Sequence, residues 1–279
     1  MITADRIEKL DGATVQHGPL NDRIYVMHPG DADARRLPEK LQRLAERNGY
    51  TKIFAKIPES SAPAFLDRGY IREAIIPGFF KGEETAFFLG RFLAPDRRRT
   101  DRAEEIEQIA ALALDSRQKK TALTPENISI GQCSEQDADA MSDVYREIFP
   151  TYPFPIDDPG YLKETMRSHV TYFAARHEEK IVALASSETD QKNATVEMTD
   201  FATLPAWRGR SLASLLLRKM ESAMRRRGLI TSHTIARALS PGMNVTFAKA
   251  GYLFGGTLVN NTNISGSVES MNVWYKRIG

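Results

Sequence analysis

The chain has 279 residues, of which 42% are apolar and 27% are charged, and its formal net charge at pH 7 is only +2. A chain of this length and apolar content can bury the core of one large domain or of two smaller ones. The near-neutral charge predicts no nucleic-acid partner, because attraction to phosphates needs a strongly basic field. No apolar run approaches the roughly 20 residues of a membrane span, so we expect no membrane partner and a cytoplasmic location.

Cysteine and histidine usage narrows the chemistry further. The single cysteine, Cys133, cannot form an internal disulfide. The five histidines show no metal-ligand spacing, so we expect no metal cofactor. They are His17, His28, His169, His177 and His233.

Residues 1–95 are predicted to form an N-terminal domain. In chain order, the apolar periodicity favours a helix over residues 37–48, a strand over 51–57, a short helix over 63–68 and a strand over 86–92. Each helix ends at a Gly-Tyr pair, and glycine commonly ends a helix.

Residues 96–125 are predicted to connect two domains. They follow Pro95 and include the basic cluster 97–99. Ile106, Ile109 and Ala113 lie at the spacing of one helical stripe, which predicts a connecting helix over residues 103–114.

Residues 126–279 are predicted to form the second domain. Ser134 and Asp137 form a variant of the capping box that opens a helix, and three prolines between residues 150 and 155 favour a stiff extended loop. The other predicted elements are strands at 128–130, 171–176, 181–188, 194–203, 230–236 and 271–276, and helices at 160–167, 214–228 and 243–250.

One succession of elements occurs twice in the chain. A helix ending in glycine, a strand, a short helix ending in Gly-Tyr and a strand occur in both the first and the second domain. We therefore expect the first domain to be a degenerate relative of the second. The alternative is that helix-glycine-strand units are simply common in mixed folds.

The segment 195–213 is the most informative part of the sequence. A strand ends in Phe201-Ala202-Thr203, a short turn rich in small residues follows, and a helix begins near Leu212. This order gathers unpaired backbone N–H groups where a diphosphate can bind, which is the geometry of an acyl-coenzyme A site. The residues expected to hold the diphosphate are Arg208, Gly209, Arg210, Ser211, Leu212 and Ala213.

Side chains and strand edges are expected to contribute to the same site. The backbone of Phe201, Ala202 and Thr203 should pair with the pantetheine arm as an added strand would. Either Arg208 or Arg210 should add a charged contact, and the other interpretation of each is an exposed surface arginine. Ser211 is expected to cap the helix that follows.

Residues 126–279 resemble the GNAT superfamily of N-acetyltransferases. The loop of that family reads Arg/Gln-x-x-Gly-x-Gly/Ala; here Arg208 fills the first position and Ala213 the last, while Ser211 stands where glycine is usual. The resemblance implies a mixed α/β (α+β) fold with a mostly antiparallel sheet flanked by helices. It also implies acetyl-CoA as co-substrate, and that the first domain, which lacks the loop, binds none.

The full length is also similar to the beta-lysine N-acetyltransferases that make the osmolyte N-epsilon-acetyl-beta-lysine. The stretches that carry this similarity are residues 49–56, 152–156, 242–247 and 271–276. The resemblance implies a small-molecule diamino acid as the acceptor. Alternatives are another small amine, a protein lysine, or a non-catalytic acyl-CoA-binding sensor. A homodimer is compatible with the sequence.

Amine acetylation needs a base, because a primary ammonium with a pKa near 10.4 must lose a proton before it attacks. The strand before the loop offers Glu197 and Asp200. Alternation places Glu197, Thr199 and Phe201 on one face and Asp200 on the other, so one carboxylate should face the acetyl group. We expect Glu197 to be the base and Asp200 a substrate or structural group; the alternative for each is a solvated carboxylate.

The leaving thiolate needs a proton, for which the resembling superfamily often uses a tyrosine on the last helix. This chain has Phe247 at that position, and Tyr252 and Tyr145 are the remaining candidates. Asn244, on the same helix, is expected to bind the cofactor or a water, or else to act as a cap. Candidates for the acceptor site are Tyr152, Phe154, Asn260 and Glu269.

Overall fold

The computed structural model describes residues 5–116 and 127–279. Its first half contains β1 Arg6–Leu10, β2 Ala13–Gly18, β3 Arg23–His28, α1 Leu37–Asn48, β4 Lys52–Pro58, α2 Ala62–Leu66, β5 Ile71–Phe80, β6 Glu84–Phe92 and α3 Ala103–Asp115. Its second half contains β7 Ile128–Gln132, α4 Ala138–Ile148, α5 Pro159–Ser168, β8 Val170–His177, β9 Lys180–Asp190, β10 Thr195–Thr203, α6 Leu212–Arg226, β11 Thr231–Arg237, α7 Pro241–Lys249, β12 Leu253–Ile264 and β13 Ser267–Arg277.

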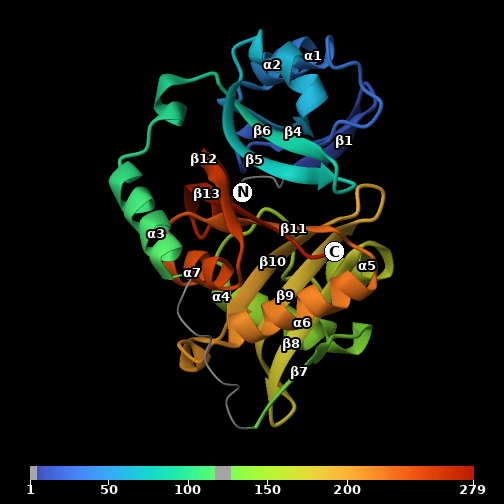
Figure 1. The fold of residues 1–279 in the computed structure, drawn as a ribbon, viewed down its shortest axis with the longest axis vertical. Coiled ribbons are helices and arrows are strands. Elements are labelled where there is room, and N and C mark those ends of the chain that lie inside the picture. Colours follow the sequence, from blue (N-terminus) through green and yellow to red (C-terminus); the bar gives the residue numbers. More distant parts are fainter. Residues whose placement is uncertain (1–4, 117–126) are drawn as a thin grey trace.

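The described strands form one mixed, mostly antiparallel sheet in the order β1-β2-β3-β4-β6-β5-β12-β13-β11-β10-β9-β8-β7. The halves meet where β5 pairs with β12 at Ala74 and Gly256 (Figure 1). Gly256 has φ 140°, and a Cβ there would lie 2.2 Å from the carbonyl oxygen of Glu73. Glycine is therefore needed for the two edges to approach closely.

The two halves repeat one pairing scheme. In the first half β3 and β4 run parallel, β4 pairs antiparallel with β6, and β6 pairs antiparallel with β5. In the second half β10 and β11 run parallel, β11 pairs antiparallel with β13, and β13 pairs antiparallel with β12. The crossover helices are α1 and α6, respectively. The repeat includes strands as well as the helices and glycines visible in the sequence.

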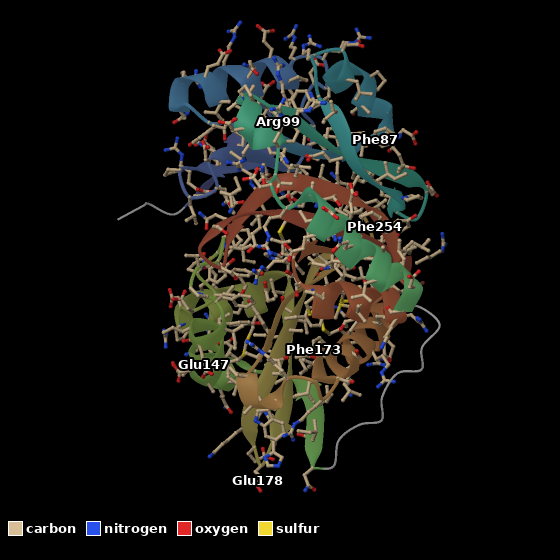
Figure 2. The ribbon with its side chains drawn as sticks, turned by 90° about the vertical axis from the view of Figure 1, so that its left-hand side faces the viewer. Phe87, Arg99, Glu147, Phe173, Glu178 and Phe254 are labelled. Carbon is tan, nitrogen blue, oxygen red and sulfur yellow. The ribbon has the colours of Figure 1, made fainter. Side chains whose placement is uncertain are left out.

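Helices cover both faces of the sheet in the second half (Figure 1). On one face, Leu216 and Met220 of α6 pack on Val196 and Met198 of β10. On the other face, α4 and α5 pack on the sheet through a second cluster. That cluster includes Met141, Tyr145, Leu162, Tyr172 and Leu184. Figure 2 shows side chains filling both halves and the layer between them.

The helices agree closely with the sequence-based prediction. Glycine ends α1 as expected, since Gly49 has φ 71° and its N–H bonds to the carbonyls of Ala45 and Glu46. The prediction missed β1, β2, β3, β5 and β12. In β5 and β12 the reason is local, because Pro77 and Gly78 lie within one and Gly255 and Gly256 within the other, and these residues usually argue against a strand.

Candidate active site

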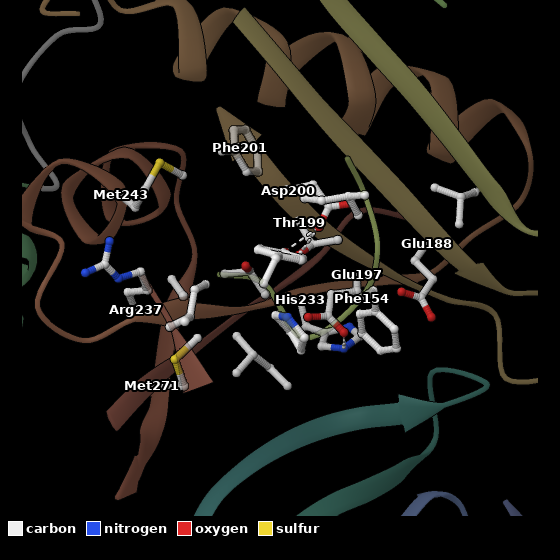
Figure 3. A pocket seen from close by; sticks show the side chains of 18 of the residues that line it. Phe154, Glu188, Glu197, Thr199, Asp200, Phe201, His233, Arg237, Met243 and Met271 are labelled. Carbon is white, nitrogen blue, oxygen red and sulfur yellow. Dashed lines mark hydrogen bonds and ion pairs between the residues drawn. The ribbon is translucent and has the colours of Figure 1, made fainter. Parts of the chain in front are cut away.

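A cavity of about 1430 Å³ lies between the two halves, and both contribute side chains to it. Figure 3 shows its central part, where Glu197 of β10 lies beside His233 of β11 and Asp200 lies beside Thr199. From the second half it is lined by Tyr152, Phe154, Glu188, Glu197, Thr199, Asp200, Phe201, His233, Arg237, Met243 and Phe247, and from the first half by Arg23, Tyr25, Phe54 and Lys56, among others.

Strands β10 and β11 open the cavity by diverging. They pair in parallel only at residues 195–197 of β10, although β10 continues to Thr203 and β11 to Arg237. Beyond Glu197, the edge of β10 that faces β11 therefore has no ladder with that strand. Phe201 and Thr203 line the cavity there, whereas Ala202 is buried on the other face of β10. An extended, amide-containing ligand can pair with such an edge.

A β-bulge places both carboxylates of β10 in the cavity. Thr199 pairs with Ser186 of β9, but the next pair joins Ala202 to Leu184, so two residues of β10 oppose one of β9. Asp200 has φ 54° and is the extra residue. The prediction that Asp200 and Glu197 point to opposite faces is therefore wrong. Strict alternation fails at the bulge, and it is Phe201 that turns to the α6 side, against Phe247.

Asp200 is held by two hydroxyl groups. Tyr152 donates to its Oδ1 and Ser186 to its Oδ2, each at 2.5 Å. Burial raises the pKa of Asp200 to about 6, although both hydrogen bonds favour the ionised form. Asp200 thus ties the proline-bounded loop that carries Tyr152 to the bulge.

Glu197 lies beside a buried imidazole. Its Oε2 is 3.5 Å from Nε2 of His233, a residue that is only 2% exposed. Burial alone would raise the pKa of Glu197, but His233 and the ammonium of Lys56 outweigh it and the pKa is lowered. Phe79 of the first half packs edge-on against His233, with ring centroids 5.0 Å apart. Glu197 is therefore ionised at neutral pH.

The turn before α6 presents backbone to the cavity. Arg208, Gly209, Ser211, Leu212 and Ala213 all line it. Gly209 has φ 76° and Ser211 has φ 60°, so two left-handed residues shape this turn just before Leu212 begins the helix. The first N–H groups of a helix have no partner within it and attract anions.

Three side chains of this turn differ in their contacts. Ser211 occupies the N-cap position but accepts no capping hydrogen bond, so the predicted cap is wrong. The cause is its left-handed backbone, since a capping side chain needs the extended conformation. The guanidinium of Arg210 stacks on Trp207, 4.6 Å from the ring centroid, and Arg210 is not among the cavity residues. Arg208 donates from Nε to the carbonyl of Thr203 at 3.3 Å.

Asn244 lies outside the cavity lining and is fully engaged in the core. Its Nδ2 donates to the carbonyls of Arg237 and Ser240 at 3.0 and 2.8 Å. Its Oδ1 accepts from Asn272 at 2.9 Å and from Trp274 at 2.8 Å. With all of these bonds made inside the protein, the geometry supports its structural alternative and not a cofactor contact.

The four acceptor candidates separate into two pairs. Tyr152 and Phe154 line the cavity, whereas Asn260 and Glu269 are not among its lining residues. Asn260 donates to the carbonyls of Arg97 and Arg99, and Glu269 forms a two-bond ion pair with Arg237. Asn260 and Glu269 are thus occupied by other protein groups, and their substrate role receives no support from this geometry.

Neither predicted replacement for the general acid reaches the cavity lining. Phe247 lines it, with its ring packed edge-on against Phe201 and Tyr252. Tyr252 shares a hydrogen bond with Ser232, and burial raises the pKa of Tyr145 and of Tyr252 well above the usual value. Burial also raises the pKa of Cys133 to about 12, which disfavours a thiolate there.

Sequence reasoning missed the cavity residues of the first half. Lys56 and Phe54 belong to the stretch 49–56, which is similar to the beta-lysine N-acetyltransferases. Lys56 is a charged residue and Phe54 an aromatic residue on the predicted strand. Arg23 and Tyr25 lie on β3, which was not predicted. The available signal was Lys56 itself, because a lysine inside a buried strand is rarely without a functional reason.

In the described part of the chain, no group of three or more His, Cys, Asp or Glu side chains could hold a metal ion. Among residues 5–116 and 127–279, none of the helices has both the length and the apolar content of a membrane span.

Comparison with known proteins agrees with this geometry. Residues 138–240 match the acetyltransferase (GNAT) family model. The chain is 37% identical over 272 residues to the beta-lysine N(6)-acetyltransferase of Methanococcus maripaludis, covering 98% of both chains. It is 38% identical over 259 residues to the protein of the same name from Methanosarcina mazei, covering 85% of this chain and 95% of that one.

A bacterial relative is also similar over nearly the full length. The N-acetyltransferase YodP of Bacillus subtilis is 31% identical over 267 residues, covering 95% of this chain and 96% of that protein. These matches confirm the fold class and the acetyl-transferring activity expected from the sequence. The chain belongs to the GNAT family of acetyltransferases.

Proposed function

We propose that the protein transfers acetyl from acetyl-CoA to the N-epsilon amine of beta-lysine, giving N-epsilon-acetyl-beta-lysine. The observation that carries the proposal is the divergence of β10 from β11 directly in front of the turn 208–213, with two carboxylates at the point of divergence. The names of two relatives that align over most of this chain supply the acceptor.

In this proposal the diverging strands and the turn together seat acetyl-CoA. The free edge at Phe201 and Thr203 pairs with the amides of the pantetheine arm, as an added strand would. The N–H groups between Gly209 and Ala213 hold the diphosphate at the positive end of α6. Arg208, which lines the cavity, adds a charge-assisted contact, whereas Arg210 does so only if it leaves Trp207.

The two carboxylates receive different roles. Glu197, ionised by His233 and Lys56, accepts the proton of the acceptor ammonium through a water. The neutral amine then attacks the thioester carbonyl, the C–N bond forms and the C–S bond breaks. The nitrogen releases its extra proton to water, and the leaving thiolate takes up a proton from solvent. Asp200 attracts the ammonium by its negative charge. It also keeps Tyr152 in place, since its two oxygens accept hydrogen bonds from the hydroxyls of Tyr152 and Ser186.

The proposal also includes the first half of the chain. We infer that residues 1–95 are a degenerate acetyltransferase-like domain, joined through residues 96–125 to a catalytic domain at 126–279. The repeated pairing scheme of β3, β4, β6 and β5 supports this. Residues 117–125 of that connection, together with residue 126, lie outside the described residues.

Release of free thiol tests the function directly. The protein is mixed with acetyl-CoA and, in separate reactions, with beta-lysine, lysine, a polyamine and a lysine-containing peptide. Fast release with beta-lysine and slow release with the others is expected. Acetyl-CoA binding without thiol release in any reaction would favour an acyl-CoA sensor. Faster thiol release with the peptide or another amine would assign that compound as the acceptor in place of beta-lysine.

A further inference from the structure

Arg23 is a buried cation without a carboxylate at ion-pair distance among the described residues, and the charges of Asp5 and Glu73 act on it only from farther away. It lies on β3 and is only 4% exposed. One of its terminal nitrogens donates to the carbonyl of Asn261 and, at 3.1 Å, to the hydroxyl of Thr262, both on β12. Its Nε has no hydrogen-bond partner among the described residues, and none of their carboxylates lies within ion-pair distance of Arg23.

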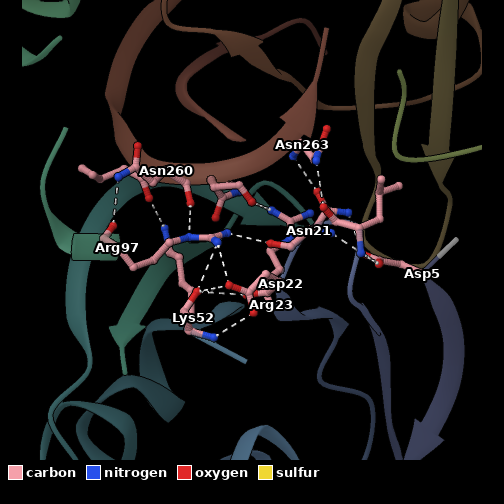
Figure 4. Close-up of polar contacts among 12 residues, drawn as sticks. Asp5, Asn21, Asp22, Arg23, Lys52, Arg97, Asn260 and Asn263 are labelled. Carbon is pink, nitrogen blue, oxygen red and sulfur yellow. Dashed lines mark hydrogen bonds and ion pairs between the residues drawn. The ribbon is translucent and has the colours of Figure 1, made fainter. Parts of the chain in front are cut away.

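The neighbouring cations at this interface are, in contrast, paired (Figure 4). Lys52 lies 2.8 Å from an oxygen of Glu73 and Arg97 lies 3.4 Å from Asp22. A buried charge without a counter-ion is costly for a protein, and it is usually kept where a ligand supplies the opposite charge. Arg23 lines the cavity, whereas Lys52 and Arg97 do not.

Aromatic rings hold the guanidinium at the cavity wall. Its central carbon lies 5.3 Å from the ring centroid of Tyr25 and 5.7 Å from that of Phe54. These rings stack on each other with centroids 4.7 Å apart, and both line the cavity. Such a platform stabilises the cation and restricts its motion while leaving its edge available for an anion. Burial lowers the pKa of Arg23 only to about 10, so it stays charged at neutral pH.

Tyr25 links this cation to the carboxylate end of the site. Its ring lies under the guanidinium of Arg23, and its hydroxyl is hydrogen-bonded to Lys56. The charges of Glu197 and Glu188 also act on it. The cavity therefore has a cationic end in the first half and an acidic end on β9 and β10. A ligand with an anion at one end and ammonium groups along its length matches this distribution.

We propose that Arg23 binds the carboxylate of the acceptor, so that the first half of the chain selects amino acids over simple polyamines. This inference rests on the proposed function and adds a specificity-determining residue to it. The acceptor amine then lies at Glu197 and Asp200, and the remaining ammonium can pair with Glu188, which also lines the cavity. A GNAT domain alone would lack this anchor.

The test compares beta-lysine with its carboxamide, which has both amines but no negative charge. We expect wild-type kcat/KM to be about 10- to 100-fold higher for the acid, the range of one charged hydrogen-bonded contact. In Arg23→Gln this ratio should fall close to one, with kcat/KM for the carboxamide largely retained. General damage to the fold would lower kcat/KM for both acceptors alike, so it could not bring the ratio close to one.

Three further variants make the outcome decisive. Arg97→Gln perturbs the same interface without touching the cavity and should keep the wild-type ratio. Arg23→Lys keeps the charge and should keep part of the preference, which covers the case in which Arg23→Gln does not fold. Lys56→Met should keep most of the preference for the acid over the carboxamide, because Arg23 is still present. A wild-type ratio near one, or the wild-type ratio kept in Arg23→Gln, would overturn the inference.

Failure of the proposed function gives a different result. In that case the wild-type protein would acetylate neither beta-lysine nor its carboxamide. Acetylation of both at equal rates would leave the proposed function standing and remove only the role of Arg23.

Discussion

Replacing Tyr152 with phenylalanine should move the acid limb of the rate profile to higher pH. The Tyr152 hydroxyl donates to Asp200 at 2.5 Å, and the pKa of Asp200 is about 6. A hydrogen bond to an ionised group contributes about 1.5–3 kcal/mol, and one pKa unit corresponds to about 1.4 kcal/mol. Because the bond stabilises the ionised form, its loss should raise the pKa of Asp200 by about 1–2 units.

The assay is kcat/KM for beta-lysine across acidic to alkaline pH, expressed as the ratio of variant to wild type. The ratio removes the titration of the acceptor amine itself, which is the same in both reactions. If an ionised Asp200 is required, the Tyr152→Phe ratio should fall as the pH drops through neutrality, and it should level off well below the pKa of the wild-type carboxyl. In that acidic range Asp200 is protonated in both proteins.

Two variants serve as controls for this shift. Ser186→Ala removes the other hydroxyl, also at 2.5 Å, and should shift the profile in the same direction. Tyr161→Phe alters another hydroxyl in the cavity that makes no hydrogen bond to Asp200 and should leave the ratio flat. A flat ratio in both Tyr152→Phe and Ser186→Ala would refute the requirement for ionised Asp200.

The other predictions concern the base, the core and the turn. Glu197→Gln should lower kcat by about 10²–10⁴-fold, the usual contribution of a general base, with little change in KM for acetyl-CoA in steady-state kinetics. Asn244→Ala leaves several buried polar groups unpaired and should lower the free energy of unfolding by about 3 kcal/mol or more in urea titrations, while coenzyme A affinity of the folded variant stays near wild type. Ser211→Gly should raise that free energy by about 0.5 kcal/mol, because relief of about 1–2 kcal/mol of left-handed strain at φ 60° exceeds the added entropy of the unfolded chain. An unchanged rate, an unchanged stability and a clear loss of stability, respectively, would contradict these three expectations.

Much of the second half could be predicted from its sequence. Apolar periodicity and glycine stops located the helices, because an amphipathic stripe and a left-handed C-terminal residue are local properties. The turn 208–213 was recognisable because it is also a local feature, a run of small residues between a strand and a helix. The structure also explains why the family usually has glycine where this chain has Ser211, since that position adopts φ 60°.

The details that decide the site depend on contacts that the sequence does not display. The bulge at Asp200 arises from the register between β10 and β9, and alternation within one strand cannot show it. The engagement of Asn244 depends on Asn272 and Trp274, which are distant in sequence. The contribution of Arg23 required β3, whose residues carry no strong period because both of its faces are largely covered.

The central claim is that the opening between β10 and β11 receives acetyl-CoA with the acceptor amine at Glu197 and Asp200. A crystal structure with coenzyme A and beta-lysine bound tests this most directly. We predict the diphosphate on the N–H groups of residues 209–213, the pantetheine arm along Phe201 and Thr203, and the N-epsilon amine beside the two carboxylates. Coenzyme A bound elsewhere, or beta-lysine with its amine turned away from Glu197 and Asp200, would contradict the account.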